Sequence, residues 1–366
     1  MPYNQKYMEL AISIAENAKG KCSPNPPVGA VIVANDIVIA TGHTQRCGQD
    51  HAEVQAIKNM PKNTSTHTEL YVTLEPCSHF GKTPPCTQAI IQAGIKNVYA
   101  ATKDPNPKVN GKGFELLQKA GINVSYPHCE DIVRKQLEYY IKWIETKKPF
   151  IILKNATSID GKIATNCGNS KWITSERARE KVHQLRSEVD AVITTINTVK
   201  TDNPTLNART PSATKQPIRV ILDTKLEIDP QSNICKTAKD YQTIVFYDSK
   251  LHEKTKITLL EQLSIKTIPV TAHKELLNID EILTILGAQN ITSILVEAGT
   301  TLNSYLLKNK YIDKIYYFIA PKILGGTKNA YDDLGIEKWD KQIKLNDIKH
   351  EIIDEDILLI GYPRYI

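Results

Sequence analysis

The spacing of apolar residues predicts that helices alternate with strands in the first third of the chain. Apolar side chains recur three and four positions apart in the helical stretches, and the strands show short apolar runs or strict alternation. Helices are expected over residues 4–19, after Asp50 as the N-cap, from Cys86 onward and over 114–121. Strands are expected at residues 28–33, 37–40, 69–75 and 98–102. This alternation favours a three-layer α/β domain.

A new pattern begins at Lys147-Lys148-Pro149, after a helical stretch over residues 130–146. The sequence therefore predicts a first domain of residues 1–146 and a second domain of residues 147–366. In the second domain we expect strands at 150–156, 191–195, 218–223, 243–247, 293–297 and 314–320, helices at 175–189 and 280–286, and a closing hairpin over 350–361. The pattern of the first domain is not repeated there. No expected strand is followed by Gly-x-Gly-x-x-Gly, so the usual dinucleotide-binding fingerprint is absent.

Composition narrows the class of protein. A chain of 366 residues with 41% hydrophobic and 23% charged residues fits two globular domains of ordinary size. Its net charge of +6 comes from scattered Lys and Arg residues without a dense basic tract, and this charge suits a phosphorylated small molecule as well as a polymer. The seven cysteines have no secreted-type spacing, and neither a signal segment nor a membrane-spanning apolar run is evident. We expect a cytoplasmic protein with reduced thiols.

Candidate chemistry lies in His51-Ala52-Glu53, taken together with Cys77 and Cys86. One imidazole and two thiolates can bind zinc and leave the fourth tetrahedral position to water. Glu53 is not needed as a ligand and is free to transfer protons. In zinc deaminases this arrangement lets an activated water attack a ring carbon that bears an amino group, with the glutamate as general acid and base. His51 and Cys86 are both expected at helix N-termini, which favour thiolate.

Other interpretations of these residues stay open. His43, His67 and Cys47 could equally be ligands, or the site could be structural with four protein ligands. Eight residues separate Cys77 from Cys86, whereas the nucleobase deaminase signature has Pro-Cys-x-x-Cys. A nucleic-acid-editing deaminase with an RNA-binding module would need a basic groove, and the second half lacks a basic cluster. In a zinc-stabilised scaffold without catalysis, Glu53 would have no role.

The long insert between the cysteines is itself informative. Together with Pro24–Val33 and Gly42-His43, the segment Cys77-Ser-His-Phe-Gly-Lys-Thr-Pro-Pro-Cys86 resembles the deaminase half of the bifunctional riboflavin-biosynthesis deaminase/reductases. The resemblance implies a cytidine-deaminase-like fold, zinc on His51, Cys77 and Cys86, and proton transfer by Glu53. It also implies that the pyrimidine and phosphate of the substrate contact Asn25, His43, His79 and Lys82.

The second half is similar to the reductase half of the same family over residues 153–161, 170–175, 198–209 and 320–326. The resemblance implies a dihydrofolate-reductase-like α/β fold that uses NADPH. The segment Ile294–Asn303, a strand, a glycine turn and a helix capped by Thr300 or Thr301, is typical of a phosphate cradle. By resemblance, NADPH would contact Ala156, Trp172, Thr198, Asp202, Thr224, Gly299, Thr300 and Thr301, and the substrate would contact Lys154, Ser170, Arg186, Leu206, Arg209 and Glu297.

Lys154 is also the candidate catalytic residue of this half, placed to stabilise charge near the anomeric carbon of the ribosyl group. Thr195, Asn203 and Ala298 depart from the commoner family pattern and affect the expected cofactor contacts. The family resemblance implies zinc-dependent deamination of 2,5-diamino-6-(5-phosphoribosylamino)pyrimidin-4(3H)-one. NADPH-dependent reduction would then give 5-amino-6-(5-phosphoribitylamino)uracil. It further implies a homo-oligomer whose partner is a small phosphorylated pyrimidine, not a nucleic acid or a membrane.

Overall fold

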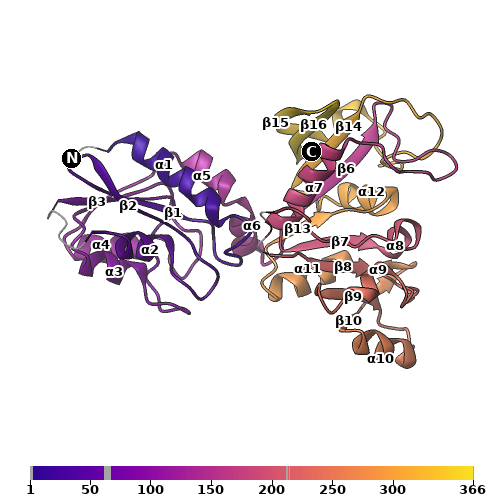
Figure 1. The fold of residues 1–366 in the computed structure, drawn as a ribbon, viewed down its shortest axis with the longest axis horizontal. Coiled ribbons are helices and arrows are strands. Elements are labelled where there is room, and N and C mark those ends of the chain that lie inside the picture. The colour runs from indigo at the N-terminus through magenta and orange to yellow at the C-terminus, as the bar shows by residue number, and fades with distance from the viewer. Residues whose placement is uncertain (1–2, 62–66, 212, 214, 366) are drawn as a thin grey trace. The chain divides into compact units, whose positions relative to one another are not determined.

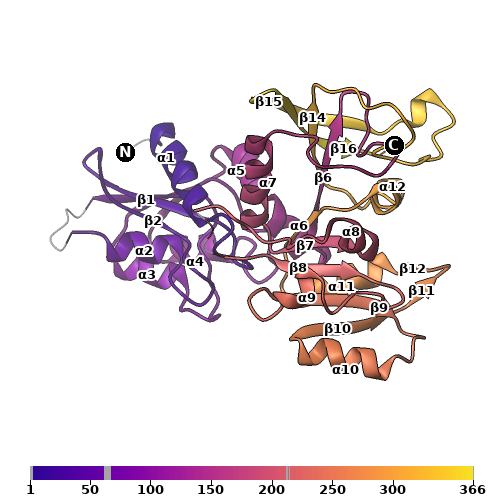
Figure 2. The same cartoon turned by 45° about the vertical axis from the view of Figure 1, so that its right-hand side comes forward.

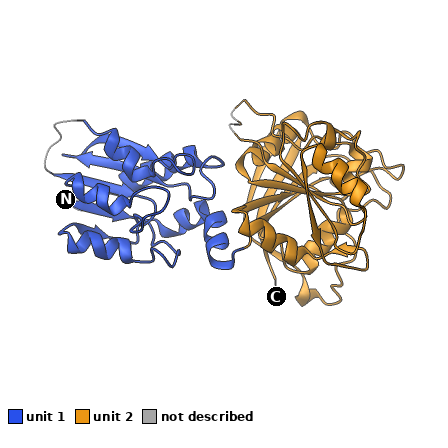
Figure 3. Ribbon diagram, turned by 90° about the horizontal axis from the view of Figure 1, so that it is seen from below, with its two compact units in different colours: residues 1–147 blue, residues 148–366 orange. Residues whose placement is uncertain are grey.

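The computed structural model describes residues 3–61, 67–211, 213 and 215–365. The chain divides into two compact units, residues 1–147 and 148–366 (Figure 3). Each unit contains a hydrophobic cluster of its own, one built from residues between Tyr7 and Ile144 and the other from residues between Ile151 and Ile315. Within the described residues, no helix has both the length and the apolar character that a bilayer crossing requires.

A five-stranded sheet in the order β2-β1-β3-β4-β5 forms the centre of the first unit. Its strands are β1 (Gly29–Ala34), β2 (Ile37–His43), β3 (Thr68–Val72), β4 (Asn97–Ala100) and β5 (Asn123–Ser125). β1 runs antiparallel to both β2 and β3, whereas β3, β4 and β5 are parallel. Asn35 and Asp36 both adopt positive φ in the tight turn between β1 and β2, a conformation typical of a two-residue hairpin turn.

Helices cover both faces of this sheet (Figure 1). They are α1 (Gln5–Ala15), η1 (Glu16–Ala18), α2 (Ala52–Lys58), α3 (Cys86–Gln92), α4 (Lys112–Lys119), α5 (Glu130–Gln136) and α6 (Glu138–Thr146). Two glycines allow helices to approach the sheet closely: a Cβ on Gly29 would lie 2.0 Å from the carbonyl oxygen of Ala11, and one on Gly42 would lie 2.3 Å from that of Ala52. The expected three-layer α/β architecture is confirmed.

The second unit is built on a nine-stranded sheet in the order β10-β9-β8-β7-β13-β6-β14-β16-β15. Its strands are β6 (Phe150–Ser158), β7 (Ala191–Thr195), β8 (Ile218–Leu222), β9 (Thr243–Asp248), β10 (Ile265–Val270), β13 (Ser293–Val296), β14 (Lys314–Ala320), β15 (Lys344–Ile353) and β16 (Asp356–Arg364). All neighbours are parallel except β16, which pairs antiparallel with β14 and β15. β6, the first strand in sequence, lies between β13 and β14.

Helices also flank this second sheet (Figure 2). They are α7 (Glu176–Glu188), α8 (Ile196–Asp202), α9 (Asn233–Lys236), α10 (Lys254–Gln262), α11 (Ile279–Ala288), α12 (Thr300–Lys308) and the short η2 (Trp339–Lys341). A separate two-stranded ribbon consists of β11 (Ala272–His273) and β12 (Leu276–Leu277). Parallel strands alternate with helices from β7 to β14, which gives the α/β fold expected for this half.

Two expected helix caps are wrong. α2 begins with His51 as its N-cap, and the Asp50 carboxylate instead pairs with Lys58 at 2.7 Å. α12 begins with Gly299 as its N-cap, which has no side chain to cap the helix, and the Thr300 hydroxyl donates to the carbonyl oxygen of Asn329 at 2.6 Å. Neither helix therefore has a side-chain cap at its N-cap residue, and the N-terminus of α12 is left available to a ligand.

Arg219 in β8 is fully buried and binds the elements around it together. Its guanidinium donates to the carbonyl oxygens of Thr205, Ile234 and Tyr241 and to the hydroxyl groups of Thr237 and Thr243, at 2.6–3.1 Å. Burial lowers the pKa of Arg219 to about 10. The bond to Thr205 fixes the start of the loop that carries Leu206 and Arg209.

Replacement of this arginine tests its structural role. Arg219→Met removes the donors and leaves three carbonyl oxygens without that partner, so we expect a loss of about 3 kcal/mol in the free energy of unfolding. Chemical denaturation followed by circular dichroism measures this loss. Arg177→Met is the control, because Arg177 is exposed and pairs with Asp354 at the surface. Equal stability of the two variants would contradict the role given to Arg219.

Candidate zinc centre and cofactor site

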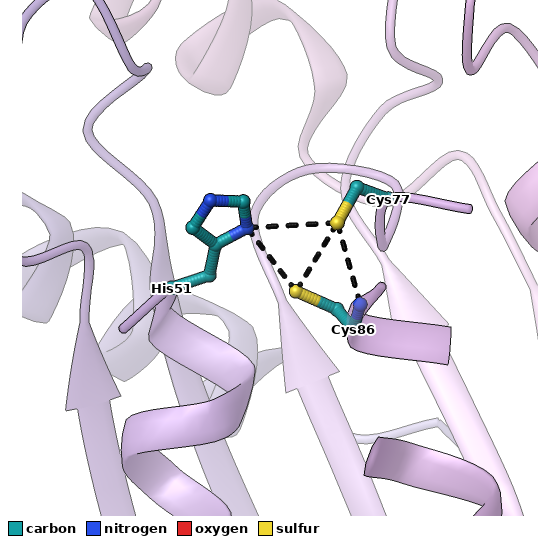
Figure 4. Close-up of side chains that lie close together, drawn as sticks. All are labelled: His51, Cys77 and Cys86. Atoms are coloured by element: carbon teal, nitrogen blue, oxygen red, sulfur yellow. Dashed lines mark hydrogen bonds between the residues drawn. The ribbon is translucent and has the colours of Figure 1, made fainter. Parts of the chain in front are cut away.

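His51, Cys77 and Cys86 meet at one point of the first unit (Figure 4). Their ligand atoms all lie within 4.8 Å of one another. His51 Nδ1 lies 3.2 Å from Cys86 Sγ and 3.6 Å from Cys77 Sγ, and the two sulfur atoms are 3.4 Å apart. The other ring nitrogen of His51, Nε2, faces the hydroxyl of Thr83 at 3.5 Å. One nitrogen thus faces the thiols, and a hydroxyl partner orients the ring from behind.

The protonation of the two thiols shows that the donor set suits a divalent cation. Hydrogen bonding from Cys86, outweighing burial, lowers the pKa of Cys77 to about 4. The same hydrogen bond, together with burial, raises the pKa of Cys86. Ionisation of one thiol therefore opposes ionisation of the other, because two adjacent thiolates would repel each other. A bound zinc ion supplies the charge that balances a second thiolate, so these residues fit zinc.

Glu53 lies in the first turn of α2 and is only 4% exposed. Burial raises the pKa of its carboxyl group to about 7, and the nearby His51 opposes this rise. A carboxyl group with such a pKa can both accept and donate a proton near neutral pH. Its place on the helix, two residues after His51, brings it to the same end of the sheet as the thiols.

A buried carboxylate fixes the segment that supplies Cys77. Glu75 accepts hydrogen bonds from the backbone amides of Asp104, Gly111 and Gly113 at 2.8–3.2 Å. A Cβ on Gly113 would lie 2.1 Å from the carbonyl oxygen of Pro76, so only glycine allows this approach. The turn-rich loop over residues 104–113 is thereby wrapped around the residue that precedes Pro76-Cys77. Sequence reasoning did not single out Glu75.

The expected substrate residues of this unit occupy three segments. The carbonyl oxygen of Asn25 accepts from the Cys22 thiol at 3.1 Å, and His43 ends β2 with a pKa lowered by burial and by Lys21. His79 and Lys82 lie in the loop that joins the two cysteines. His79 Nδ1 is buried without a hydrogen-bond partner among the described residues. It therefore has an unused donor or acceptor for a ligand.

The alternative ligands do not join the cluster. Among the described residues, the His, Cys and acidic groups that approach closely enough to share a metal ion are His51, Cys77 and Cys86, without His43, His67 or Cys47. The Cys47 sulfur instead lies 3.6 Å from the Lys82 ammonium nitrogen.

In the second unit a cavity of about 340 Å³ opens beside the N-terminus of α12. Five expected cofactor residues line it: Thr198, Thr224, Gly299, Thr300 and Thr301. A Cβ on Gly299 would meet no atom within 4 Å, so the backbone borders open space there. The uncapped amides of α12 and this space fit the diphosphate of a dinucleotide. Lys225, Glu275 and Tyr305 also line the cavity and were missed, because no short motif connects positions so distant in sequence.

Three expected cofactor residues lie outside the lining of this cavity. Ala156 is part of β6 opposite Phe318, and Asp202 is the last residue of α8. Trp172 is 65% exposed, and the Arg179 guanidinium lies 4.4 Å from the centre of its ring. Trp172 therefore does not belong to the core.

Expected substrate residues of the second unit form a polar network. Arg186 pairs with Glu297 through two hydrogen bonds of 2.5 and 2.9 Å, and donates a third to the carbonyl oxygen of Asn207 at 3.1 Å. Burial opposes ionisation of Glu297, but Arg186 outweighs it and the pKa of Glu297 is lowered. Burial lowers the pKa of Lys154, and Glu297 opposes that shift. Lys154 and Glu297 thus each shift the pKa of the other towards its charged form.

Leu206 and Ser170 are two further expected substrate residues of the second unit. Leu206 is buried and adopts a φ of 56°, which turns the chain between Thr205 and Asn207. Ser170 is half-buried in the loop before Trp172.

Comparison with known proteins finds a separate family match within each unit. Residues 1–102 match the cytidine and deoxycytidylate deaminase zinc-binding region, and residues 149–359 match the RibD C-terminal domain. The riboflavin biosynthesis protein RibD of Aquifex aeolicus is 42% identical over 99% of both chains. That of Escherichia coli is 35% identical over 98% of this chain and 99% of its own.

Solved structures agree over the same length. RibD of Acinetobacter baumannii matches with a TM-score of 0.88 at 34% identity, covering 98% of each chain. A diaminohydroxyphosphoribosylaminopyrimidine deaminase/5-amino-6-(5-phosphoribosylamino)uracil reductase from Thermotoga maritima matches with a TM-score of 0.84, also at 34% identity and 98% coverage of each chain.

Zinc content distinguishes the ligand set from its alternatives. Cys86→Ser replaces one thiolate with a weaker ligand, so we expect less than about half the zinc per chain of the unmodified protein after dialysis. Cys47→Ser should retain full zinc, because Cys47 lies outside the cluster. Elemental analysis of both purified variants provides the measurement, and zinc loss in the Cys47 variant alone would refute this ligand set.

Proposed function

The chain belongs to the RibD family of bifunctional riboflavin-biosynthesis enzymes, and from this we propose how its residues divide the two reactions. The enzyme hydrolytically deaminates 2,5-diamino-6-(5-phosphoribosylamino)pyrimidin-4(3H)-one with zinc as its cofactor. It then reduces the ribosyl group with NADPH to give 5-amino-6-(5-phosphoribitylamino)uracil. We assign the first step to residues 1–146 and the second to residues 147–366.

The cluster of His51, Cys77 and Cys86 beside the buried Glu53 is the observation that carries the deaminase assignment. These three residues would hold the zinc ion, which when bound would supply an activated water for attack on the amino-bearing carbon. Glu53 accepts a proton from that water and delivers it to the departing ammonia. Burial keeps its proton affinity close to what this exchange requires at neutral pH.

The substrate residues of the deaminase site surround this cluster in our proposal. Asn25 and His43 contact the pyrimidine ring, His79 presents its unpartnered Nδ1 to a polar group of the substrate, and Lys82 attracts the phosphate. Thr83 ties the loop that carries His79 and Lys82 to His51. Binding of substrate by this loop is therefore coupled to the orientation of a metal ligand.

In the reductase site, NADPH supplies the hydride when it is bound. The amides at the start of α12 bind its diphosphate, and Thr198, Thr224 and the 299–301 turn contact the rest of the molecule. Ala156, Trp172 and Asp202 contribute from outside the cavity. The uncapped α12 N-terminus beside open space supports this assignment.

The reacting sugar lies near Lys154, Arg186 and Glu297 in our proposal. Arg186 donates three hydrogen bonds, two to the Glu297 carboxylate and one to the carbonyl oxygen of Asn207. One N–H group on each terminal nitrogen of the guanidinium then remains for the substrate. Arg209 binds the phosphate, Leu206 and Ser170 line the site, and Lys154 polarises the oxygen on which negative charge develops. Burial lowers the pKa of this lysine and so eases its release of a proton.

We also propose a cytoplasmic location and a homo-oligomeric assembly. The thiols of Cys77 and Cys86 are 3.4 Å apart and must stay reduced to bind zinc, which favours a reducing compartment. Light scattering of the purified enzyme determines the number of chains.

The two steps are separable by mutation. Glu53→Gln keeps the shape of the side chain but removes its acid–base function, so we expect ammonia release to fall at least about hundredfold. Zinc content and NADPH oxidation with the deaminated substrate should be unchanged. Glu69→Gln, which alters another buried carboxyl group of the same unit, should keep ammonia release. Loss of both reactions in the Glu53 variant would contradict independent sites.

Lys154→Met tests the reductase assignment. The substitution preserves most of the side-chain volume but removes the ammonium group, so kcat for NADPH oxidation should fall about hundredfold or more. The Kd of NADPH, measured by fluorescence titration, should change little, and ammonia release should be normal. Lys266→Met, at an exposed position on β10, is the control. A kcat within twofold of the unmodified enzyme would exclude Lys154 from the chemistry.

A further inference from the structure

His183 lies at the centre of the polar network in the second unit, although no motif singled it out. It occupies α7 one turn before Arg186, so both side chains emerge on the same face of the helix. The loop after α8 brings Asn207 and Arg209 to this face. His183 is half-buried between the two arginines, and it contacts both of them and the loop.

The contacts of the imidazole determine its tautomer. His183 Nδ1 lies 3.1 Å from the carbonyl oxygen of Asn207, which can only accept, so Nδ1 carries the hydrogen. Nε2 then has a lone pair, and it lies 2.9 Å from Nη2 of Arg209, which can only donate. Burial and the charges of Arg186 and Arg209 lower the pKa of His183 to about 4, so the ring is neutral at physiological pH. The imidazole accepts a hydrogen bond from one arginine without adding a charge.

The two arginines have different partners. Arg186 pairs with the Glu297 carboxylate, which cancels much of its charge. Arg209 is exposed, and its partners among the described residues are the neutral Nε2 of His183 and the neutral Oδ1 of Asn207, at 2.9 and 3.2 Å. A long exposed side chain has many rotamers, and two fixed acceptors restrict them. Neutral acceptors orient the guanidinium and leave its positive charge for an anion.

We propose that His183 is a positioning residue of the reductase, whose neutral Nε2 holds the Arg209 guanidinium ready for the phosphate of the substrate. This inference rests on the proposed role of Arg209 as the phosphate contact. It extends that role, because it explains how an exposed arginine keeps both a fixed direction and its full charge. The substrate phosphate is a dianion, which a planar guanidinium can bind through two parallel hydrogen bonds.

Two substitutions separate the hydrogen bonds of His183. His183→Asn places an amide where Nδ1 was and can keep the bond to the Asn207 carbonyl, but it does not reach Arg209. His183→Gln places an amide oxygen where Nε2 was and can keep the bond to Arg209. With saturating NADPH, we expect the KM for 5-amino-6-(5-phosphoribosylamino)uracil to rise about tenfold in the Asn variant and to stay within about threefold in the Gln variant, with kcat little changed.

Substrate without phosphate shows whether the effect concerns the phosphate. Steady-state kinetics with 5-amino-6-ribosylaminouracil, the unphosphorylated counterpart, should give the same kcat/KM for both variants and the unmodified enzyme. Ammonia release and thermal unfolding should also be unchanged, which establishes that the variants are folded. An equal loss of kcat/KM with both substrates would show that His183 serves structure alone and would overturn the proposal.

A double-mutant cycle with Arg209→Met tests whether His183 acts through Arg209. If it does, His183→Asn adds no further increase in KM once Arg209 is absent. A full tenfold effect in the Arg209→Met background would refute the inference. If Arg209→Met alone leaves KM unchanged, the phosphate role of Arg209 falls and the inference falls with it. If Arg209→Met raises KM but His183→Asn does not, the inference alone is wrong.

Discussion

Both candidate sites depend on the position at which helices that follow strands begin their first turn. In the first unit, α2 and α3 begin at His51 and Cys86, so the imidazole, a thiol and the general acid–base Glu53 reach one point. In the second unit, α12 begins without a side-chain cap beside the cavity. Parallel strands direct the starts of successive helices to the same edge of a sheet. The ligand positions therefore follow from the direction of the strands.

Local patterns in the sequence were sufficient to predict most of the helices and strands of the fold. β7 and β14 begin and end where the apolar runs indicated, because buried strands show their length directly in such runs. The sequence pattern does not show which partner a polar side chain binds. The pattern predicts Asp50 as the N-cap of α2, but the Asp50 carboxylate pairs with Lys58. The ribbon of β11 and β12 contains two residues per strand and is too short to leave a pattern.

The residues of the candidate sites also fall into two groups, those that the sequence reveals and those that it does not. His51, Cys77 and Cys86 could be found because each ligand type has a recognisable chemistry and the spacing belongs to a known family. Glu75 and His183 could not, because their importance lies in partners that are distant in sequence. Glu75 binds the amides of a loop 29 to 38 residues later, and His183 contacts Arg209 only after α8 has turned the chain back. A residue that acts by holding another one leaves no motif of its own.

The position of β6 determines when the second unit can form during synthesis. β6 is the first strand of that unit to leave the ribosome, yet its neighbours β13 and β14 end at Val296 and Ala320. An apolar strand must therefore wait for about 160 residues before both of its edges are paired. Contacts of such sequence separation slow folding and leave unpaired strands exposed to other chains. The first unit has all its strands by Ser125, so the deaminase can fold while the reductase is still being made.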